Sequence, residues 1–146
     1  MVTVALTCLL IVALAITVHY EALRLLNFIL PRLRTPPRQR VFLAVLGTFI
    51  AHAFEILLYG LALFILVKFV SEGVLNGTAT FSLRTCLYFS AETFTSLGFG
   101  DLTPAGPVRL LAGVEALNGL LLIGWSASFT YLAMQRFWFA DSGMDH

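Results

Sequence analysis

The sequence contains few charged residues. Asp, Glu, Lys and Arg make up 12% of its 146 residues and hydrophobic residues 59%, whereas charged residues are about 25% of a soluble domain. The net charge is +1, with no basic patch of the kind that binds nucleic acid. The composition therefore excludes an ordinary soluble domain and a nucleic-acid partner, and it predicts an integral membrane protein.

Other features are also scarce. The two cysteines, Cys8 and Cys86, lie in apolar stretches without redox or metal-binding spacing, so we expect both to be small buried hydrophobic residues. None of the apolar stretches carries the repeated arginines of a voltage sensor. A voltage-sensing mechanism of that kind is therefore not expected.

Three long apolar runs are present, at residues 2–18, 41–70 and 108–134, and a spanning helix needs about 20 such residues. The first run lacks a basic leader and a clear cleavage site, so we expect a retained helix. We expect this helix to leave the bilayer near residues 19–21 and to follow the interface to residue 30. Residues 81–95 are too short and too polar to cross, and they predict a re-entrant helix that returns as a loop.

Charge placement predicts the orientation. Arg32, Arg34, Arg38 and Arg40 lie in the short linker 31–40, which the positive-inside rule places in the cytoplasm. The N-terminus and the loop after the second run are then outside, and the tail 135–146 is cytoplasmic. The same arginines lie within reach of lipid headgroups, although topology alone explains them.

One segment differs from all of these runs: Thr95-Ser96-Leu97-Gly98-Phe99-Gly100-Asp101. Two glycines around an aromatic residue suit a backbone that points successive carbonyls in one direction, and such carbonyls can replace the water shell of a cation. From about residue 83 to 136, with residues 41–70 before them, the chain resembles the pore module of tetrameric potassium channels, most strongly in residues 87–104, LYFSAETFTSLGFGDLTP. The similarity is to bacterial and two-pore-domain channels, in both the filter and the helix before it.

This resemblance implies an all-α membrane protein with a potassium-channel pore fold, assembled as a homotetramer. Together with the three apolar runs, it predicts three transmembrane helices with a re-entrant pore helix, and we expect a location in the bacterial inner membrane. The segments expected are an additional N-terminal helix 1–30, linker 31–40, outer helix 41–70, pore helix 83–95, filter 96–100 and inner helix 107–134, the pore domain being 41–134. The protein is then a channel and not an enzyme, with no cofactor and with K⁺ as the permeant ion.

The resemblance also implies roles in the filter. The carbonyls of Ser96, Leu97, Gly98 and Phe99, with the Ser96 hydroxyl, would bind K⁺, and Gly100 would shape the outer mouth. We expect Gly98 and Gly100 to have positive φ and Phe99 to pack behind the filter. Ser96, Leu97 and Phe99 depart from the common TVGYG pattern, so a weakly selective Na⁺/K⁺ channel is an alternative. A non-conducting auxiliary or scaffold subunit is another.

Several residues would support the filter. Ser82 is a plausible N-cap of the pore helix, and Thr95 leads into the filter. The resemblance implies that Glu92 and Asp101 share a proton, since two carboxyls in a low dielectric do not both ionise. Glu92 paired with backbone amides, or with Arg84 or Arg109, is the alternative.

Polar residues within the apolar runs are costly and are candidates for function. His52 and Glu55 lie three residues apart, on one helix face, and we expect them to pair with each other and with the first helix or a neighbouring subunit rather than to bind a metal. Glu115 and Asn118 have the same spacing; they would bond to the back of the pore helix or line the ion path.

The inner run also contains the glycines Gly119 and Gly124. Each is either a gating hinge or a point of close helix packing.

Overall fold

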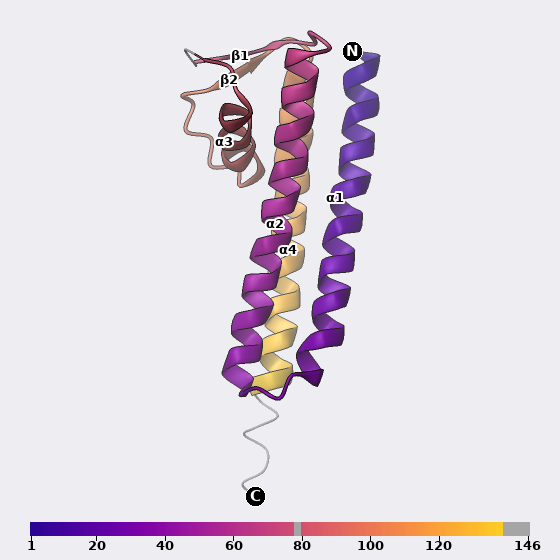
Figure 1. Ribbon diagram of the computed structural model, residues 1–146, viewed down its shortest axis with the longest axis vertical. Coiled ribbons are helices and arrows are strands. Elements are labelled where there is room, and N and C mark those ends of the chain that lie inside the picture. Colours follow the sequence, from indigo (N-terminus) through magenta and orange to yellow (C-terminus); the bar gives the residue numbers. More distant parts are fainter. Residues whose placement is uncertain (78–79, 139–146) are drawn as a thin grey trace, which may run out of the picture.

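The computed structural model describes residues 1–77 and 80–138, and this part of the chain is mostly helical (Figure 1). The elements are α1 (Val2–Ile29), a 3₁₀ turn η1 (Leu30–Arg32), α2 (Pro37–Lys68), β1 (Val74–Asn76), α3 (Leu83–Phe94), β2 (Thr103–Ala105) and α4 (Val108–Trp138). Residues 139–146, the larger part of the expected tail, lie outside the described residues, whereas the first part of that tail continues α4.

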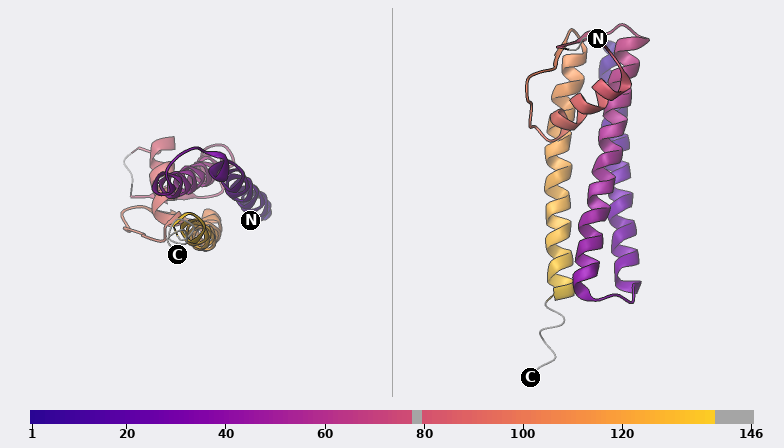
Figure 2. Two further views of the ribbon diagram at one scale, coloured as in Figure 1. Left: turned by 90° about the horizontal axis from the view of Figure 1, so that it is seen from below. Right: turned by 60° about the vertical axis from the view of Figure 1, so that its left-hand side comes forward.

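The three long helices lie side by side, and α3 crosses α2 and α4 near one end of the bundle (Figure 2). By length and composition, three segments could cross a membrane: Val2–Arg32, Pro37–Lys68 and Val108–Phe137. Helix α3 has 12 residues, too few to cross, because a spanning helix needs about 20. The expected arrangement of three spans and one short re-entrant helix is therefore confirmed, and it agrees with an all-α pore fold.

The first helix does not follow the expected path. Helix α1 continues beyond residues 19–21 while still packed against α2 and α4, and His19 is fully buried. The helix stays beside its neighbours to its end instead of turning aside, because Leu23 is buried and Asn27 accepts from Arg136 of α4 at 3.3 Å. The chain turns only after Leu30, and Pro37 occupies the first turn of α2, where its fixed φ and missing N–H suit the start of a helix.

A small two-stranded sheet that the sequence did not suggest joins the two ends of the pore loop. Strands β1 and β2 pair antiparallel, with Leu75 opposite Pro104. Before them, Gly73 has φ +140°, and an added Cβ would lie 2.4 Å from the Ala105 carbonyl oxygen, so only glycine fits. The Glu72 carboxylate pairs with the Met1 ammonium at 3.0 Å, which places the N-terminus at the same end of the bundle (Figure 1).

The core lies where the helices meet. Its largest cluster joins all four helices, and Cys8 and Cys86 belong to it as buried free thiols, as expected. A second cluster closes the opposite end of the bundle and contains Leu30, Val41, Ala44, Ala133 and Phe137. Many large apolar side chains are exposed on the outer faces of the long helices, among them Leu9, Phe49, Phe54, Leu121 and Leu132, which suits a surface in contact with lipid or other subunits.

Candidate functional site

Helix α3 leads directly into the filter segment. Its N-cap is Ser82, whose hydroxyl accepts a hydrogen bond from the Thr85 N–H at 3.2 Å, as the sequence predicted. The helix ends at Phe94, one residue before the expected end, and Thr95 is its C-cap. The Thr95 hydroxyl donates to the Ala91 carbonyl at 2.8 Å, so this side chain holds the last turn of α3 closed.

The filter backbone alternates in conformation. Ser96, Gly98 and Gly100 have φ of +56°, +56° and +80°, and the residues between them do not have positive φ. The two glycines behave as predicted. The positive φ of Ser96 was not expected. A residue with a side chain adopts this left-handed conformation at a cost of order 1–3 kcal/mol, and only where the surrounding structure holds it there.

The amides of residues 97–99 turn toward Glu92. The N–H groups of Leu97 and Gly98 donate to the Glu92 carbonyl at 2.9 and 3.3 Å, and the Phe99 N–H donates to the Glu92 carboxylate at 3.1 Å. Within the part of the chain that the structure describes, the carbonyl oxygens of residues 96–99 accept no hydrogen bond. The amides of residues 97–99 are thus satisfied on the α3 side, while the four carbonyl oxygens have no hydrogen-bond donor among the described residues.

The predicted hydrogen bond between Glu92 and Asp101 is not formed. The Glu92 side chain is buried and accepts a hydrogen bond from the Phe99 amide. This is the alternative in which Glu92 pairs with backbone amides. Asp101 instead accepts from the Tyr88 hydroxyl and from the Leu102 N–H, both at 3.1 Å. The carboxyls therefore support opposite ends of the segment, Glu92 from behind and Asp101 at its mouth.

The two large apolar side chains of the filter segment are exposed in the single chain. Leu97 is 60% exposed and Phe99 is 66% exposed. The expected packing of Phe99 behind the filter is therefore not made within one chain. This face of the segment is available to another surface.

The polar residues of α4 bond to the elements behind the filter. Glu115 accepts from the Ser90 hydroxyl of α3, and that hydroxyl also lies 2.8 Å from the Ile56 carbonyl oxygen of α2. Asn118 donates to the Tyr59 hydroxyl at 3.0 Å. Of the two roles expected for Glu115, the bond to the pore helix is confirmed, and Asn118 joins α4 to α2.

Gly119 and Gly124 of α4 differ in their surroundings. A Cβ added to Gly119 would lie 2.1 Å from the Phe94 carbonyl oxygen, whereas one added to Gly124 would meet nothing within 4 Å. Gly119 is therefore the point where α4 touches the end of α3, and packing explains it. The hinge role of Gly124 stays a prediction.

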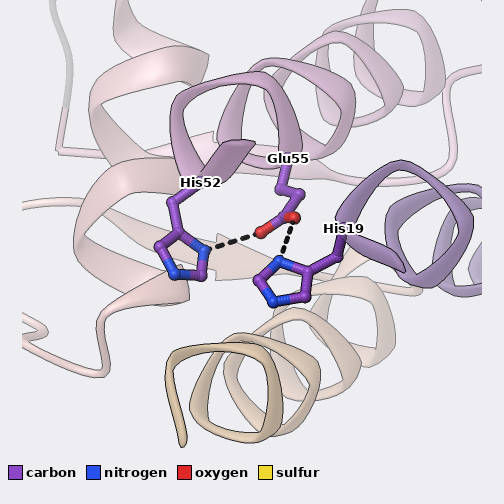
Figure 3. Close-up of side chains that lie close together, drawn as sticks. All are labelled: His19, His52 and Glu55. Carbon is purple, nitrogen blue, oxygen red and sulfur yellow. Dashed lines mark hydrogen bonds and ion pairs between the residues drawn. The ribbon is translucent and has the colours of Figure 1, made fainter. Parts of the chain in front are cut away.

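His52 and Glu55 pair as predicted, and a third residue that the sequence reasoning missed joins them. The Glu55 carboxylate lies 2.8 Å from Nδ1 of His52 and 2.8 Å from Nδ1 of His19 in α1 (Figure 3). The predicted pairing with the first helix is thus confirmed. The sequence does single out His19, because it is an ionisable residue within a long apolar run. It was not considered a candidate because the helix was expected to leave the bilayer at this residue.

Residues 41–136 match a protein family described as "Ion channel". The inward rectifier potassium channel Kirbac3.1 of Paramagnetospirillum magnetotacticum is 33% identical over 76 residues, 51% of this chain and 26% of that protein. The potassium voltage-gated channel protein Shal of Drosophila melanogaster is 36% identical over 64 residues, 42% of this chain and 11% of that protein.

These relatives are longer than the segment they share with this chain, which covers about a quarter of one and a tenth of the other. No solved structure matches the chain. The family match covers the helices α2, α3 and α4 with the filter segment between them and leaves α1 outside.

Proposed function

The chain belongs to this ion-channel family, and on that premise we propose that it conducts K⁺ passively through a filter built from residues 96–100 of four identical chains. Membership in the family identifies an integral membrane channel rather than an enzyme. The names of both relatives support potassium as the ion. The ion moves down its electrochemical gradient, and we propose no cofactor.

One observation carries this proposal. The carbonyl oxygens of Ser96, Leu97, Gly98 and Phe99 accept no hydrogen bond within the described residues, while the amides of residues 97–99 are bonded to Glu92. Rings of such carbonyls replace the hydration shell of K⁺ in potassium channels. The Ser96 hydroxyl would add an oxygen at the inner end, and Gly100 and Asp101 would form the outer mouth.

The number of four chains comes from the resemblance to tetrameric potassium channels, and two arguments support an oligomer of this kind. A single filter strand cannot surround an ion, and most oligomers of identical chains have closed symmetry. The exposed side chains of Leu97 and Phe99 supply apolar surface for the neighbouring chains. Phe99 would then pack behind the filter against the next subunit.

The orientation is part of the same proposal. The N-terminus and α3 lie at one end of the bundle, and the linker between α1 and α2 lies at the other (Figure 1). The linker's arginines favour the cytoplasm, so the filter and the N-terminus face outward and the C-terminus faces the cytoplasm. We propose a bacterial plasma membrane, with lipids around the bundle and lipid headgroups near the arginines.

Reconstitution into liposomes tests the proposal. A reversal potential at the potassium equilibrium value, under a K⁺ gradient with Na⁺ on the opposite side, supports selective conduction. A potential near zero under equal Na⁺ and K⁺ indicates the weakly selective channel that the unusual Ser96 and Leu97 leave as the alternative. No flux from a folded tetramer would favour the scaffold role and contradict conduction.

Gly98→Ala provides the matched variant. Gly98 has φ +56° and nothing lies within 4 Å of an added Cβ, so the substitution acts through the backbone, where the left-handed conformation costs about 1–2 kcal/mol. We expect loss of K⁺ preference or of flux. Gly113→Ala also meets open space and has no positive φ, so it should leave selectivity intact; equal selectivity in both variants would contradict the filter assignment.

A further inference from the structure

The cluster of His19, His52 and Glu55 has no part in the proposed conduction path. Glu55 and His52 come from α2 and His19 from α1, and both rings turn Nδ1 toward the carboxylate between them (Figure 3). One ligand atom from each residue lies within 4.8 Å of the other two. Two imidazoles and a carboxylate thus converge from two helices.

We propose that these residues form a binding site for a divalent transition-metal ion, Zn²⁺ foremost, which joins α1 to the pore module. Two histidines and a glutamate are a known zinc ligand set, with a fourth position left for water. A tetrahedral ion with bonds of about 2.1 Å holds its ligands about 3.4 Å apart. The two nitrogen–oxygen pairs, now 2.8 Å apart, therefore move apart as the ion takes the place of the two hydrogen bonds.

Charge favours an ion at this position. Glu55 and His19 are fully buried, and within residues 1–77 and 80–138 no lysine or arginine is paired with Glu55. With neutral imidazoles the cluster keeps the full negative charge of the carboxylate, which is costly in a low dielectric. A bound divalent cation compensates this charge and bonds all three side chains.

The surroundings suit a metal ligand. When Nδ1 of His19 binds the ion, Nε2 carries hydrogen and can donate to the Ser126 hydroxyl of α4, 3.4 Å away. Partners of this kind orient metal-binding histidines. The His52 side chain is 17% exposed whereas those of the other two ligands are fully buried, so an ion would enter past the His52 ring.

The position of the site gives α1 a role. The His52 ring lies 5.7 Å from the ring of Phe94 at the end of α3, and the His19 ring lies 5.3 Å from that of Trp125 in α4. An ion held here would brace α1 and α2 beside the end of the pore helix. The site stands independently of conduction, because it rests only on the three side chains.

Metal titration of the intact chain in detergent, purified without a histidine tag, tests the site. The chain has three histidines, so a His146→Ala background leaves His19 and His52 as its only imidazoles. Calorimetry with Zn²⁺ should give one ion per chain, and Co²⁺ should give the intense visible absorption of a tetrahedral site. Zn²⁺ should also raise the unfolding temperature, because it binds the folded state alone.

Ligand variants separate a metal site from a hydrogen-bonded brace. His52→Gln and Glu55→Gln should each raise the Zn²⁺ dissociation constant more than about 100-fold, beyond the loss typical of an outer-shell partner, and should abolish the Zn²⁺-dependent rise in unfolding temperature. Glu115→Gln alters a buried acid outside the cluster and should leave Zn²⁺ affinity unchanged.

Two results would overturn the proposal. One is a Zn²⁺ affinity of the background chain that is no higher than that of Glu55→Gln. This variant retains polar atoms that face both histidines, so it keeps the test valid if His52→Gln misfolds. The other is a Co²⁺ spectrum that is identical in all variants. In either case the cluster is a hydrogen-bonded brace, whose variants change the unfolding temperature equally with and without metal.

Discussion

Gly119→Ala probes the contact between α4 and the end of the pore helix. The added Cβ would lie 2.1 Å from the Phe94 carbonyl oxygen and 2.9 Å from its carbon. These are backbone atoms, so no side-chain rotation relieves the clash. The helices must separate by nearly 1 Å to restore a distance of 3.0 Å, the lower limit of real Cβ contacts.

The energies favour a loss of stability. Overpacking costs about 1–3 kcal/mol of folding stability, and we place Gly119→Ala near the upper end of this range because the clash is with backbone atoms. Replacing glycine by alanine within a helix offsets about 1 kcal/mol of this cost. The net loss is about 2 kcal/mol, or roughly 4–8 °C in unfolding temperature for a chain of this size. Because Phe94 immediately precedes Thr95 and the filter, the same displacement should also reduce K⁺ flux.

Gly113 and Gly124 provide the controls, since a Cβ at either position meets nothing within 4 Å. Their alanine variants should be as stable as the parent or more stable. Thermal unfolding in detergent, followed by circular dichroism, compares the three variants directly. If Gly119→Ala unfolds at the same temperature as the controls, α4 does not pack against Phe94 as the structure has it.

Two further predictions concern the pore helix and its support of the filter. Ser82→Ala should cost about 1 kcal/mol by removing the cap on the Thr85 N–H, seen as faster amide hydrogen exchange in the first turn of α3, while Ser82→Thr should retain protection; unchanged exchange in Ser82→Ala would contradict the cap. Glu92→Ala leaves the Phe99 amide without its acceptor, at a cost of about 1–3 kcal/mol, and should impair K⁺ flux in liposomes. Glu92→Gln keeps an acceptor oxygen and should conduct; equal flux through both variants would show that the bond does not support the filter.

Local sequence patterns were sufficient for much of the fold. Apolar runs indicated the three long helices, since crossing a bilayer sets their length and hydrophobicity. Ser82 marked the start of α3, and the glycines of the filter adopted positive φ as expected. These features depend on neighbours in the chain, so periodicity and residue type were enough.

Features that depend on distant contacts were not predictable in this way. The resemblance implied a proton shared by Glu92 and Asp101, but Glu92 accepts from the Phe99 amide and Asp101 accepts from the Tyr88 hydroxyl. The β1–β2 sheet pairs strands that are separated by the whole pore loop. The partner of a polar group is decided by which groups meet in space. The sequence offers several possible partners for each polar group and does not distinguish between them.

The sequence by itself determined that this is a membrane protein with an ion-channel pore segment, because hydropathy and the spacing of glycines act locally along the chain. Only the tertiary structure decided that His19 belongs with His52 and Glu55 and that Gly119 is a packing contact. Both depend on how α1, α2, α3 and α4 lie beside one another. A buried polar group must find a partner wherever the fold offers one, and that partner can lie 36 residues away, as Glu55 does from His19.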